Sequence, residues 1–291
     1  MRTPLKQISS EAQAIAQITR PHVAAQAALY TILGAYLGTG NVISQLPTVI
    51  AAALVVAVVV AFGFVINDDI DLELDLLTKP ARPLPAGLLS RADARRLEFG
   101  LGGTAMLLAI WLPPPLFWIA AANLALTAAY SLALKRTVLL GNLAMAILNS
   151  SVILFGGFAA GTLSALSWIV AAMSFLYTIA QEVIYTVDDI EGDRQAGLVT
   201  TAVYLGVARS LQLFRSLMVL TMLVALAPLW IVRPSPLYLA VLLVCTLLPI
   251  VLYVLPLARH YQPAKVRQAC EAVKIIRLTS LLPLILLRTS L

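Results

Sequence analysis

The sequence has few charged residues. Asp, Glu, Lys and Arg make up 12% of its 291 residues, whereas 60% are hydrophobic and the mean hydropathy is +0.92. A soluble domain has about a quarter of its residues charged, so this composition excludes an ordinary water-soluble domain. It indicates an integral membrane protein.

Cysteine and histidine are scarce as well, with two residues of each. Cys245 lies within an apolar run and Cys270 lies near the start of another. Neither has the spacing of a metal ligand, so we expect both cysteines to be small apolar filler residues.

Long apolar runs are abundant. A helix needs about 20 mostly apolar residues to cross a hydrocarbon core about 30 Å thick. The third run is short and ends in three prolines, 113–115, which must break a helix and reverse the chain. We predict an all-α bundle of nine transmembrane helices, over residues 21–38, 46–67, 97–112, 116–134, 138–160, 166–187, 211–232, 237–257 and 270–287.

The basic residues predict the orientation of these helices. Fifteen of the 20 Lys and Arg residues fall on alternate connections, in the segments 1–20, 68–96, 135–137, 188–210 and 258–268. Because cytoplasmic loops of membrane proteins are enriched in Lys and Arg, we expect a cell-membrane protein whose N-terminal segment and long loops, 68–96 and 188–210, face the cytoplasm. This bias and a role in phosphate binding account for the net charge of +6, so nucleic acid is not an expected partner.

Acidic residues are few but concentrated. Nine of the 14 lie in two clusters, 67–75 and 188–193, each at the end of an apolar run. Asn67, Asp71 and Asp75 are four residues apart, so their side chains would stack along one face of a helix. Like charges packed this closely require cations. Oxygen ligands without His or Cys favour Mg²⁺ over zinc.

The two clusters share a pattern. Asp68 lies three residues before Asp71 and joins the aligned face, while Asp69 and Glu73 lie off it and are expected to be exposed or outside the ligand set. Asp189 and Asp193 repeat the four-residue spacing in the second cluster. The clusters lie about 120 residues apart, which is compatible with two four-helix repeats plus a ninth helix. Their acidic faces would then meet across a central cavity.

The sequence resembles the UbiA superfamily of intramembrane prenyltransferases over residues 18–287. The resemblance is carried by five motifs, Arg20-Pro21-His22, Asn-Asp-x-x-Asp-x-x-x-Asp over 67–75, Arg82-Pro83-Leu84-Pro85-x-Gly87, Tyr130-Ser131-Leu132-x-Leu134-Lys135-Arg136 with Gly141-Asn142, and Asp189-x-x-x-Asp193-Arg194 with Gly197.

The resemblance implies one transmembrane domain, 1–291, with a nine-helix bundle around a cavity open to lipid. It implies that the cavity binds a polyprenyl diphosphate through Mg²⁺ and transfers the prenyl group to a lipophilic or aromatic acceptor, such as a quinone precursor. Mg²⁺ and fixed cations would stabilise the negative charge that develops on the leaving diphosphate.

Roles for individual residues follow from the resemblance and from this chemistry. The candidate metal ligands are Asn67, Asp68, Asp71, Asp75, Asp189 and Asp193. The candidate catalytic residues are Asp71, Asp75, Glu182, Tyr185, Asp189 and Asp193. The candidate substrate-binding residues are Arg20, Lys79, Arg82, Tyr130, Lys135, Asn142 and Arg194.

Several of these residues have a simpler interpretation. Lys79, Arg82 and Lys135 could only set the topology, as we expect for Arg91, Arg95 and Arg96, and Arg20 could only anchor a helix at the interface. Glu182 lies inside the sixth predicted span, where an ionised group costs about 2.5 to 3.5 kcal/mol. We therefore expect Glu182 to face the cavity, as a base, beside a metal ligand, or as the partner of an Arg or Lys.

Two positions depart from the family. Tyr185-Thr186 stand where many members have a Lys-Asp pair, and Gln181 stands where members that prenylate glycerol phosphate lipids have Arg. The string over 189–197 resembles the digeranylgeranylglycerylphosphate synthase, homogentisate and chlorophyll synthase branches. These features leave the acceptor open.

Three functions fit these features. A Mg²⁺-dependent prenyltransferase is the main prediction. The alternative is a UbiA-type terpene cyclase, which would act on a prenyl diphosphate without an acceptor. A transporter or lipid-binding protein would also have many spans, but it does not explain two carboxylate clusters on one side of the membrane.

Overall fold

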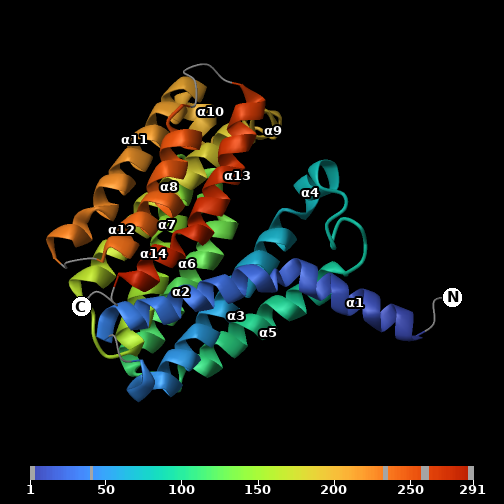
Figure 1. Cartoon of the computed structure of the whole chain (residues 1–291). Helices are drawn as coiled ribbons and strands as arrows, with labels where there is room; N and C mark the ends of the chain where they lie inside the picture. The colour runs from blue at the N-terminus through green and yellow to red at the C-terminus, as the bar shows by residue number, and fades with distance from the viewer. Residues whose placement is uncertain (1–3, 40–41, 232–234, 257–261, 288–291) are drawn as a thin grey trace. The chain divides into compact units, whose positions relative to one another are not determined.

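The computed structural model describes residues 4–39, 42–231, 235–256 and 262–287 (Figure 1). The structure is 84% helix, and its described residues contain no strand, so the all-α prediction is confirmed. Parts of the predicted connections 39–45, 233–236 and 258–268, and the last residue of two predicted spans, 232 and 257, lie outside the described residues. The chain divides into two compact units, Met1–Ala133 with Phe155–Thr162, and Leu134–Leu154 with Leu163–Leu291. Each unit is described by itself.

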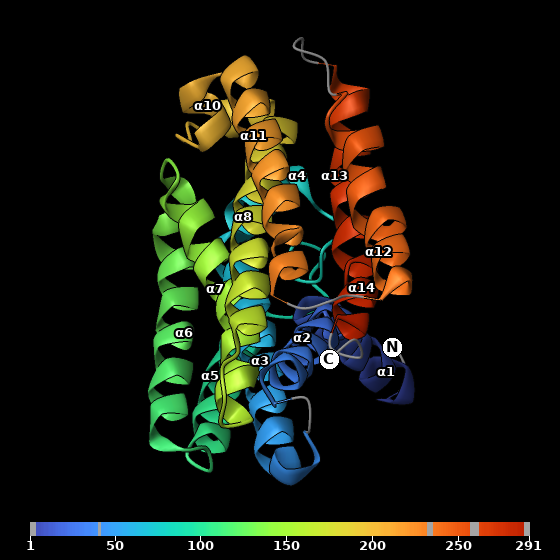
Figure 2. The same cartoon turned by 60° about the vertical axis from the view of Figure 1, so that its left-hand side comes forward.

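The first unit is built around one long apolar helix, α3. Its helices are α1 (Pro4–Thr19), α2 (Pro21–Thr39), α3 (Leu46–Ile70), α4 (Leu72–Thr78), α5 (Arg91–Ala109) and α6 (Pro114–Leu132), with a 3₁₀ turn, η1, over Ile43–Gln45. Helix α3 packs against α1, α2, α5 and α6, and Figures 1 and 2 show α2 and α5 alongside it. The first acidic cluster therefore begins at the end of the helix around which this unit is packed.

The second unit is built around α8. Its elements are η2 (Leu134–Arg136), α7 (Leu140–Ala159, whose last residues belong to the first unit), α8 (Ala165–Asp188), α9 (Ile190–Gln195), α10 (Thr201–Leu205), α11 (Val207–Ala225), η3 (Ala227–Trp230), α12 (Pro236–Leu242), the π-helical segments η4 (Leu243–Leu247) and η5 (Ile250–Val254), α13 (Pro263–Thr279) and α14 (Leu281–Leu286). Helix α8 packs against α10, α11 and α13.

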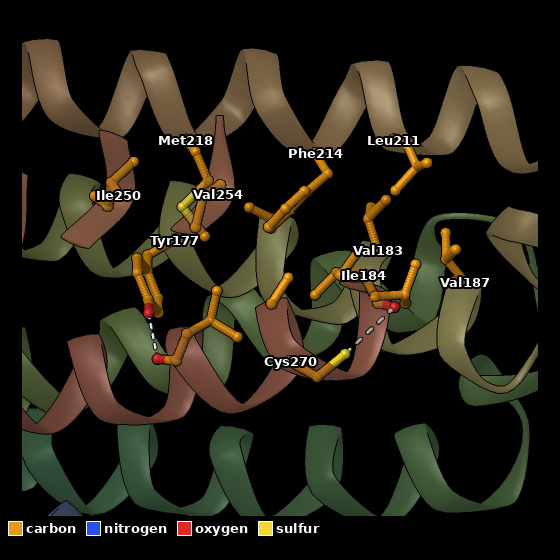
Figure 3. Close-up of a cluster of buried hydrophobic side chains, with 14 of the residues drawn as sticks. Tyr177, Val183, Ile184, Val187, Leu211, Phe214, Met218, Ile250, Val254 and Cys270 are labelled. Atoms are coloured by element: carbon orange, nitrogen blue, oxygen red, sulfur yellow. Dashed lines mark hydrogen bonds between the residues drawn. The ribbon is translucent and has the colours of Figure 1, made fainter. Parts of the chain in front are cut away.

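The core of the second unit joins α8, α11 and α13. Figure 3 shows Phe214 and Met218 of α11 directed toward α8. Cys270 of α13 is buried in this core, with its Sγ 3.9 Å from the carbonyl oxygen of Ile184. Cys270 is thus an apolar filler, as expected, whereas Cys245 is only partly buried.

Six helical stretches are long and apolar enough to cross a membrane, within the described residues. They are Ile43–Ile70, Pro114–Leu132, Leu140–Ala159, Ala165–Asp188, Val207–Trp230 and Pro236–Val254. Helices α2, α5 and α13–α14 run over the other three predicted spans but are not among the six. Helices α5 and α13 each carry several charged residues, and Ser280 separates α13 from α14. The count of nine spans therefore stays a prediction, as do the four-helix repeats and the single domain.

The chain reversal at the three prolines occurs as predicted. Helix α5 ends at Ala109 and α6 begins at Pro114. Proline has no N–H to donate, so it is tolerated in the first turn of a helix, where backbone N–H groups have no intrahelical partner. This is where Pro114 and Pro115 lie.

Helices α2 and α7 approach each other closely at Gly156. A Cβ atom added there would lie 1.8 Å from the carbonyl oxygen of Thr31 and 3.0 Å from the backbone nitrogen of Ala35. Both neighbours are backbone atoms, which cannot move aside as a flexible side chain can. Only glycine fits at this contact.

We expect Gly156→Ala to destabilise the protein by about 2 kcal/mol or more, because α2 and α7 must separate to admit the methyl group. Thermal unfolding of the purified protein in detergent measures this change. The control is Gly103→Ala on α5, where no atom lies within 4 Å of an added Cβ. An unfolding midpoint for Gly156→Ala equal to that of the control would contradict the close packing.

Candidate functional site

The first acidic cluster spans a break between two helices. Helix α3 ends at Ile70, Asp71 has φ −86° and ψ 4°, and α4 begins at Leu72. The break interrupts the single helical face on which the spacing would place these side chains. The four-residue spacing survives the break, because the Asp71 N–H donates to the Asn67 carbonyl at 3.0 Å and the Asp75 N–H donates to the Asp71 carbonyl at 2.8 Å.

Arg82 joins two of the predicted metal ligands. Its Nη1 lies 3.2 Å from Asp68 Oδ1 and 2.6 Å from Asp75 Oδ2. The two carboxylate side chains are only 4% and 2% exposed, and Arg20 Nη2 adds a third contact, 3.2 Å from Asp68 Oδ1. Two nearly buried carboxylates thus converge on one cationic nitrogen. The loop after α4 that carries Arg82 is the predicted diphosphate-binding segment.

Arg20 lies between α1 and α2, where its backbone has a φ of 47°. Its guanidinium lies 4.3 Å from the centroid of the Phe64 ring, so it stacks on an aromatic face while it pairs with Asp68. Burial lowers the pKa of the Arg20 guanidinium, and the neighbouring Asp68 carboxylate opposes that shift. Arg20 is therefore more than an interfacial anchor, because it is part of the cation set around Asp68.

The remaining members of the first cluster contact one another less closely. Asn67 Nδ2 donates to Asp71 Oδ2 at 3.1 Å. Lys79 Nζ lies 4.0 Å from Asp75 Oδ1, and its side chain is half exposed. Glu73 is exposed, as its place off the aligned face predicted. Lys79 thus borders the Asp68–Arg82–Asp75 contact through Asp75.

Asp69 is buried, and sequence reasoning missed its partners. Arg91 Nε lies 2.6 Å from Asp69 Oδ1, and Arg95 Nε lies 3.2 Å from Asp69 Oδ2. Both arginines lie on α5, which packs against α3, and their four-residue spacing places them on one face. Asp69 is therefore buried rather than exposed, and the alternative that it lies outside the ligand set stays a prediction. Arg91 and Arg95 do more than set the topology, because they fasten α5 to the end of α3.

The second acidic cluster repeats the local backbone of the first. Helix α8 ends at Asp188, and Asp189 has φ −90° and ψ 5° before α9 begins at Ile190. The Asp193 N–H donates to the Asp189 carbonyl at 2.9 Å. The repetition predicted from the spacing thus extends to the helix break itself.

The side chains of the second cluster are more open to solvent than those of the first. Asp189 is exposed, and Asp193 Oδ2 accepts a hydrogen bond of 2.8 Å from Thr200 Oγ1. Arg267 Nε lies 3.8 Å from Asp188 Oδ1.

The other predicted substrate-binding residues lie on different elements of the two units. Arg194 is exposed and pairs with Glu191 at 3.4 Å. Asn142 is buried, and its Nδ2 donates to Thr201 Oγ1 at 3.2 Å, which ties α7 to α10. Tyr130 lies on α6 in the first unit, and Lys135 lies on η2 in the second.

Two predicted catalytic residues lie on the last turns of α8. Tyr185 OH accepts a hydrogen bond of 2.6 Å from Gln181 Nε2. Glu182 is partly buried and is attracted electrostatically by Arg277 of α13, whose Nη2 also donates to Thr178 Oγ1 at 2.9 Å. The three roles predicted for Glu182, a base, a residue beside a metal ligand, or the partner of an Arg or Lys, stay predictions.

Within the described residues, no three His, Cys, Asp or Glu side chains lie close enough together to hold a metal ion. In the first unit, arginine side chains form ion pairs with Asp68, Asp69 and Asp75. The donor chemistry fits Mg²⁺ nonetheless, because the converging groups are carboxylates already gathered around a positive charge.

We expect Asp69→Asn to lower the free energy of unfolding by about 1 to 2 kcal/mol, because a buried carboxylate with two arginine partners loses its charge. Equilibrium unfolding in detergent measures the change. Asp93→Asn is the matched control, because Asp93 is an exposed aspartate on α5 that pairs with Arg96. Equal losses for both variants would contradict the fastening role.

Comparison with known proteins places the chain in a family. It matches the model of the UbiA prenyltransferase family over residues 27–276. Digeranylgeranylglyceryl phosphate synthase of Methanoculleus marisnigri is 37% identical over 198 residues, which cover 68% of this chain and 70% of that protein. The enzyme of the same name from Thermococcus kodakarensis is 33% identical over 218 residues, which cover 75% of this chain and 78% of that protein.

Solved structures of UbiA homologues have a fold similar to that of this chain. A structure from work on digeranylgeranylglyceryl phosphate synthase in membranes superposes with a TM-score of 0.78 at 25% identity and covers 94% of this chain and 97% of that chain. A UbiA homologue from Archaeoglobus fulgidus bound to GPP and Mg²⁺ has the same fold, with a TM-score of 0.69 at 18% identity over 95% of this chain and 99% of that chain. The chain therefore belongs to the UbiA prenyltransferase family and is a multi-pass membrane prenyltransferase.

Proposed function

We propose that the protein binds a polyprenyl diphosphate with Mg²⁺ at the first acidic cluster and transfers the prenyl group to the hydroxyl of a lipid acceptor. The observation that carries this proposal is the convergence of Asp68 and Asp75 on Arg82. Carboxylates and arginines at the end of a membrane-spanning helix match the two charged partners of such a reaction, the metal and the diphosphate.

Asn67, Asp68, Asp71 and Asp75 would hold one Mg²⁺, and Asp189 and Asp193 would hold a second. When bound, Mg²⁺ neutralises the charge that develops on the departing diphosphate. The fixed cations of the chain supply further stabilisation of the same charge. The structure of the Archaeoglobus fulgidus homologue with GPP and Mg²⁺ supports this assignment at the level of the family.

Arg82 and Arg20 would change partners when the ligands bind. Both guanidinium groups now neutralise Asp68, and Arg82 also neutralises Asp75. Once the carboxylates bind metal, these arginines are released to hydrogen-bond diphosphate oxygens, which arginine recognises well. Lys79 lies beside Asp75 with its ammonium half exposed and can serve the same anion.

The reaction exchanges one carbon–oxygen bond for another. The bond between the allylic carbon of the donor and the diphosphate oxygen breaks, and the electron pair leaves with diphosphate. The acceptor oxygen then bonds to that carbon, and its hydroxyl proton passes to the released diphosphate. The site must exclude the water that would otherwise capture the cation.

A glyceryl phosphate lipid is the acceptor that the relatives favour. The relatives described above are named for the synthesis of digeranylgeranylglyceryl phosphate, so we propose a prenylated glyceryl phosphate rather than a quinone precursor. The same names favour transfer over cyclisation. The basic residues of the 68–96 loop, including Arg82, support a cytoplasmic position for the site in the cell membrane.

The metal assignment predicts that Asp68→Asn and Asp75→Asn each lower kcat/KM for prenyl transfer by about 100-fold or more, because charge stabilisation in the transition state is lost. The measurement is transfer of a labelled prenyl group in reconstituted vesicles. Asp93→Asn serves as the control, since Asp93 is exposed and pairs with Arg96. Chelation of Mg²⁺ should abolish transfer and its addition should restore it. Full activity of both cluster variants would overturn the assignment.

The acceptor assignment predicts that the wild-type protein converts a prenylated glyceryl phosphate and a labelled prenyl diphosphate to an ether product. Parallel reactions contain an aromatic acceptor or no acceptor. Product from the aromatic acceptor alone would refute the glyceryl phosphate assignment. A cyclic hydrocarbon formed without acceptor would show the cyclase instead.

A further inference from the structure

A polar seam runs inside the second unit between α8 and α13. Thr178, Gln181 and Tyr185 follow one another at three and four residues, so they share a face of α8. Helix α13 packs against α8 and contacts both ends of this set. Arg277 donates to Thr178, and the Lys274 ammonium lies 5.8 Å from the centroid of the Tyr185 ring.

The Gln181 amide is the unsatisfied member of this seam. Its side chain is buried with the residue only 7% exposed, and its Oε1 has no hydrogen-bond partner among the described residues. A buried polar atom without a partner is costly, so native proteins nearly always satisfy such atoms. An unpaired amide oxygen in a membrane-spanning helix therefore points to a ligand that donates a hydrogen bond.

Tyr185 completes a pair of complementary groups. Its hydroxyl oxygen accepts from Gln181 Nε2 at 2.6 Å, and in the described part of the chain no group accepts the Tyr185 proton. A ligand hydroxyl could donate to Gln181 Oε1 and accept from Tyr185. If the amide were turned by 180°, Tyr185 would donate to the amide oxygen and the amide nitrogen would need an acceptor, which a hydroxyl also provides.

The charges of the seam argue against an anionic ligand at this point. Lys274 Nζ pairs with Glu271 Oε1 at 2.7 Å, and Arg277 attracts Glu182 while it donates to Thr178. Lys274 is thus paired with a carboxylate, and Arg277 is occupied by Thr178. A neutral hydroxyl fits the remaining groups better than a phosphate or a diphosphate does.

We propose that Gln181 and Tyr185 bind the hydroxyl of the acceptor that receives the prenyl group. This inference rests on the proposed function, in which the acceptor is an alcohol. At a rise of about 1.5 Å per residue, Tyr185 lies about 6 Å and Gln181 about 12 Å along α8 from Asp189. The acceptor hydroxyl is therefore held one to two helical turns from the second acidic cluster.

The test measures binding and turnover of Tyr185→Phe and Gln181→Leu. Each removes one hydrogen bond to the acceptor, so KM for a prenylated glyceryl phosphate should rise by about 3- to 10-fold while KM for the prenyl diphosphate is unchanged. Thr246→Val is the matched control, because Thr246 is also buried with an unpartnered hydroxyl in the described structure but lies on η4. The control should leave both KM values unchanged.

An acceptor analogue whose reacting hydroxyl is replaced by hydrogen gives a second readout that needs no turnover. The wild-type protein should bind this analogue about 3- to 10-fold more weakly than the acceptor, and both variants should lose that preference. A rise in the donor KM alone, or a preference for the hydroxyl that the variants retain, would overturn the inference. If the wild-type protein transfers no prenyl group to an alcohol, the proposed function itself fails, and that result differs from either outcome for the variants.

Discussion

The first unit depends on neutralising carboxylates that are buried at the end of α3 and on α4. Asp68 and Asp75 are almost inaccessible to solvent, and an uncompensated charge in such a place would cost several kcal/mol. Arg82 and Arg20 compensate for it. The segment after α4 and the junction of α1 with α2 are therefore tied to the end of α3 by charge, and Asp69 ties α5 to the same place.

Two acidic clusters with the same backbone have different electrostatic environments. In both, a helix breaks at an aspartate, and the aspartate four residues later donates its N–H back to it. Arginine closes the first cluster, whereas Asp189 in the second is exposed. An exposed aspartate such as Asp189 is open to a cation from solvent. In the proposed reaction, metal binding at the first cluster must instead compete with Arg82 and thereby release it for the diphosphate.

The polar seam between α8 and α13 contains polar side chains inside the second unit. Lys274 there pairs with Glu271 and Arg277 donates to Thr178, while the amide of Gln181 has a spare hydrogen-bonding atom. This division separates two tasks that a prenyltransferase must perform. Charged clusters at helix ends suit the diphosphate, and a neutral pair inside the membrane-spanning helix suits the hydroxyl that attacks.

The sequence by itself determined the helical class, the break at the three prolines and the four-residue spacing of the acidic residues. These features depend on local chemistry, which is hydrophobic length, the missing N–H of proline and the periodicity of a helix. It did not determine the partners of Asp69, the Asp68–Arg82–Asp75 contact or the unsatisfied amide of Gln181. Those depend on which faces of α3, α5, α8 and α13 meet, and that is fixed only when side chains far apart in the chain pack together.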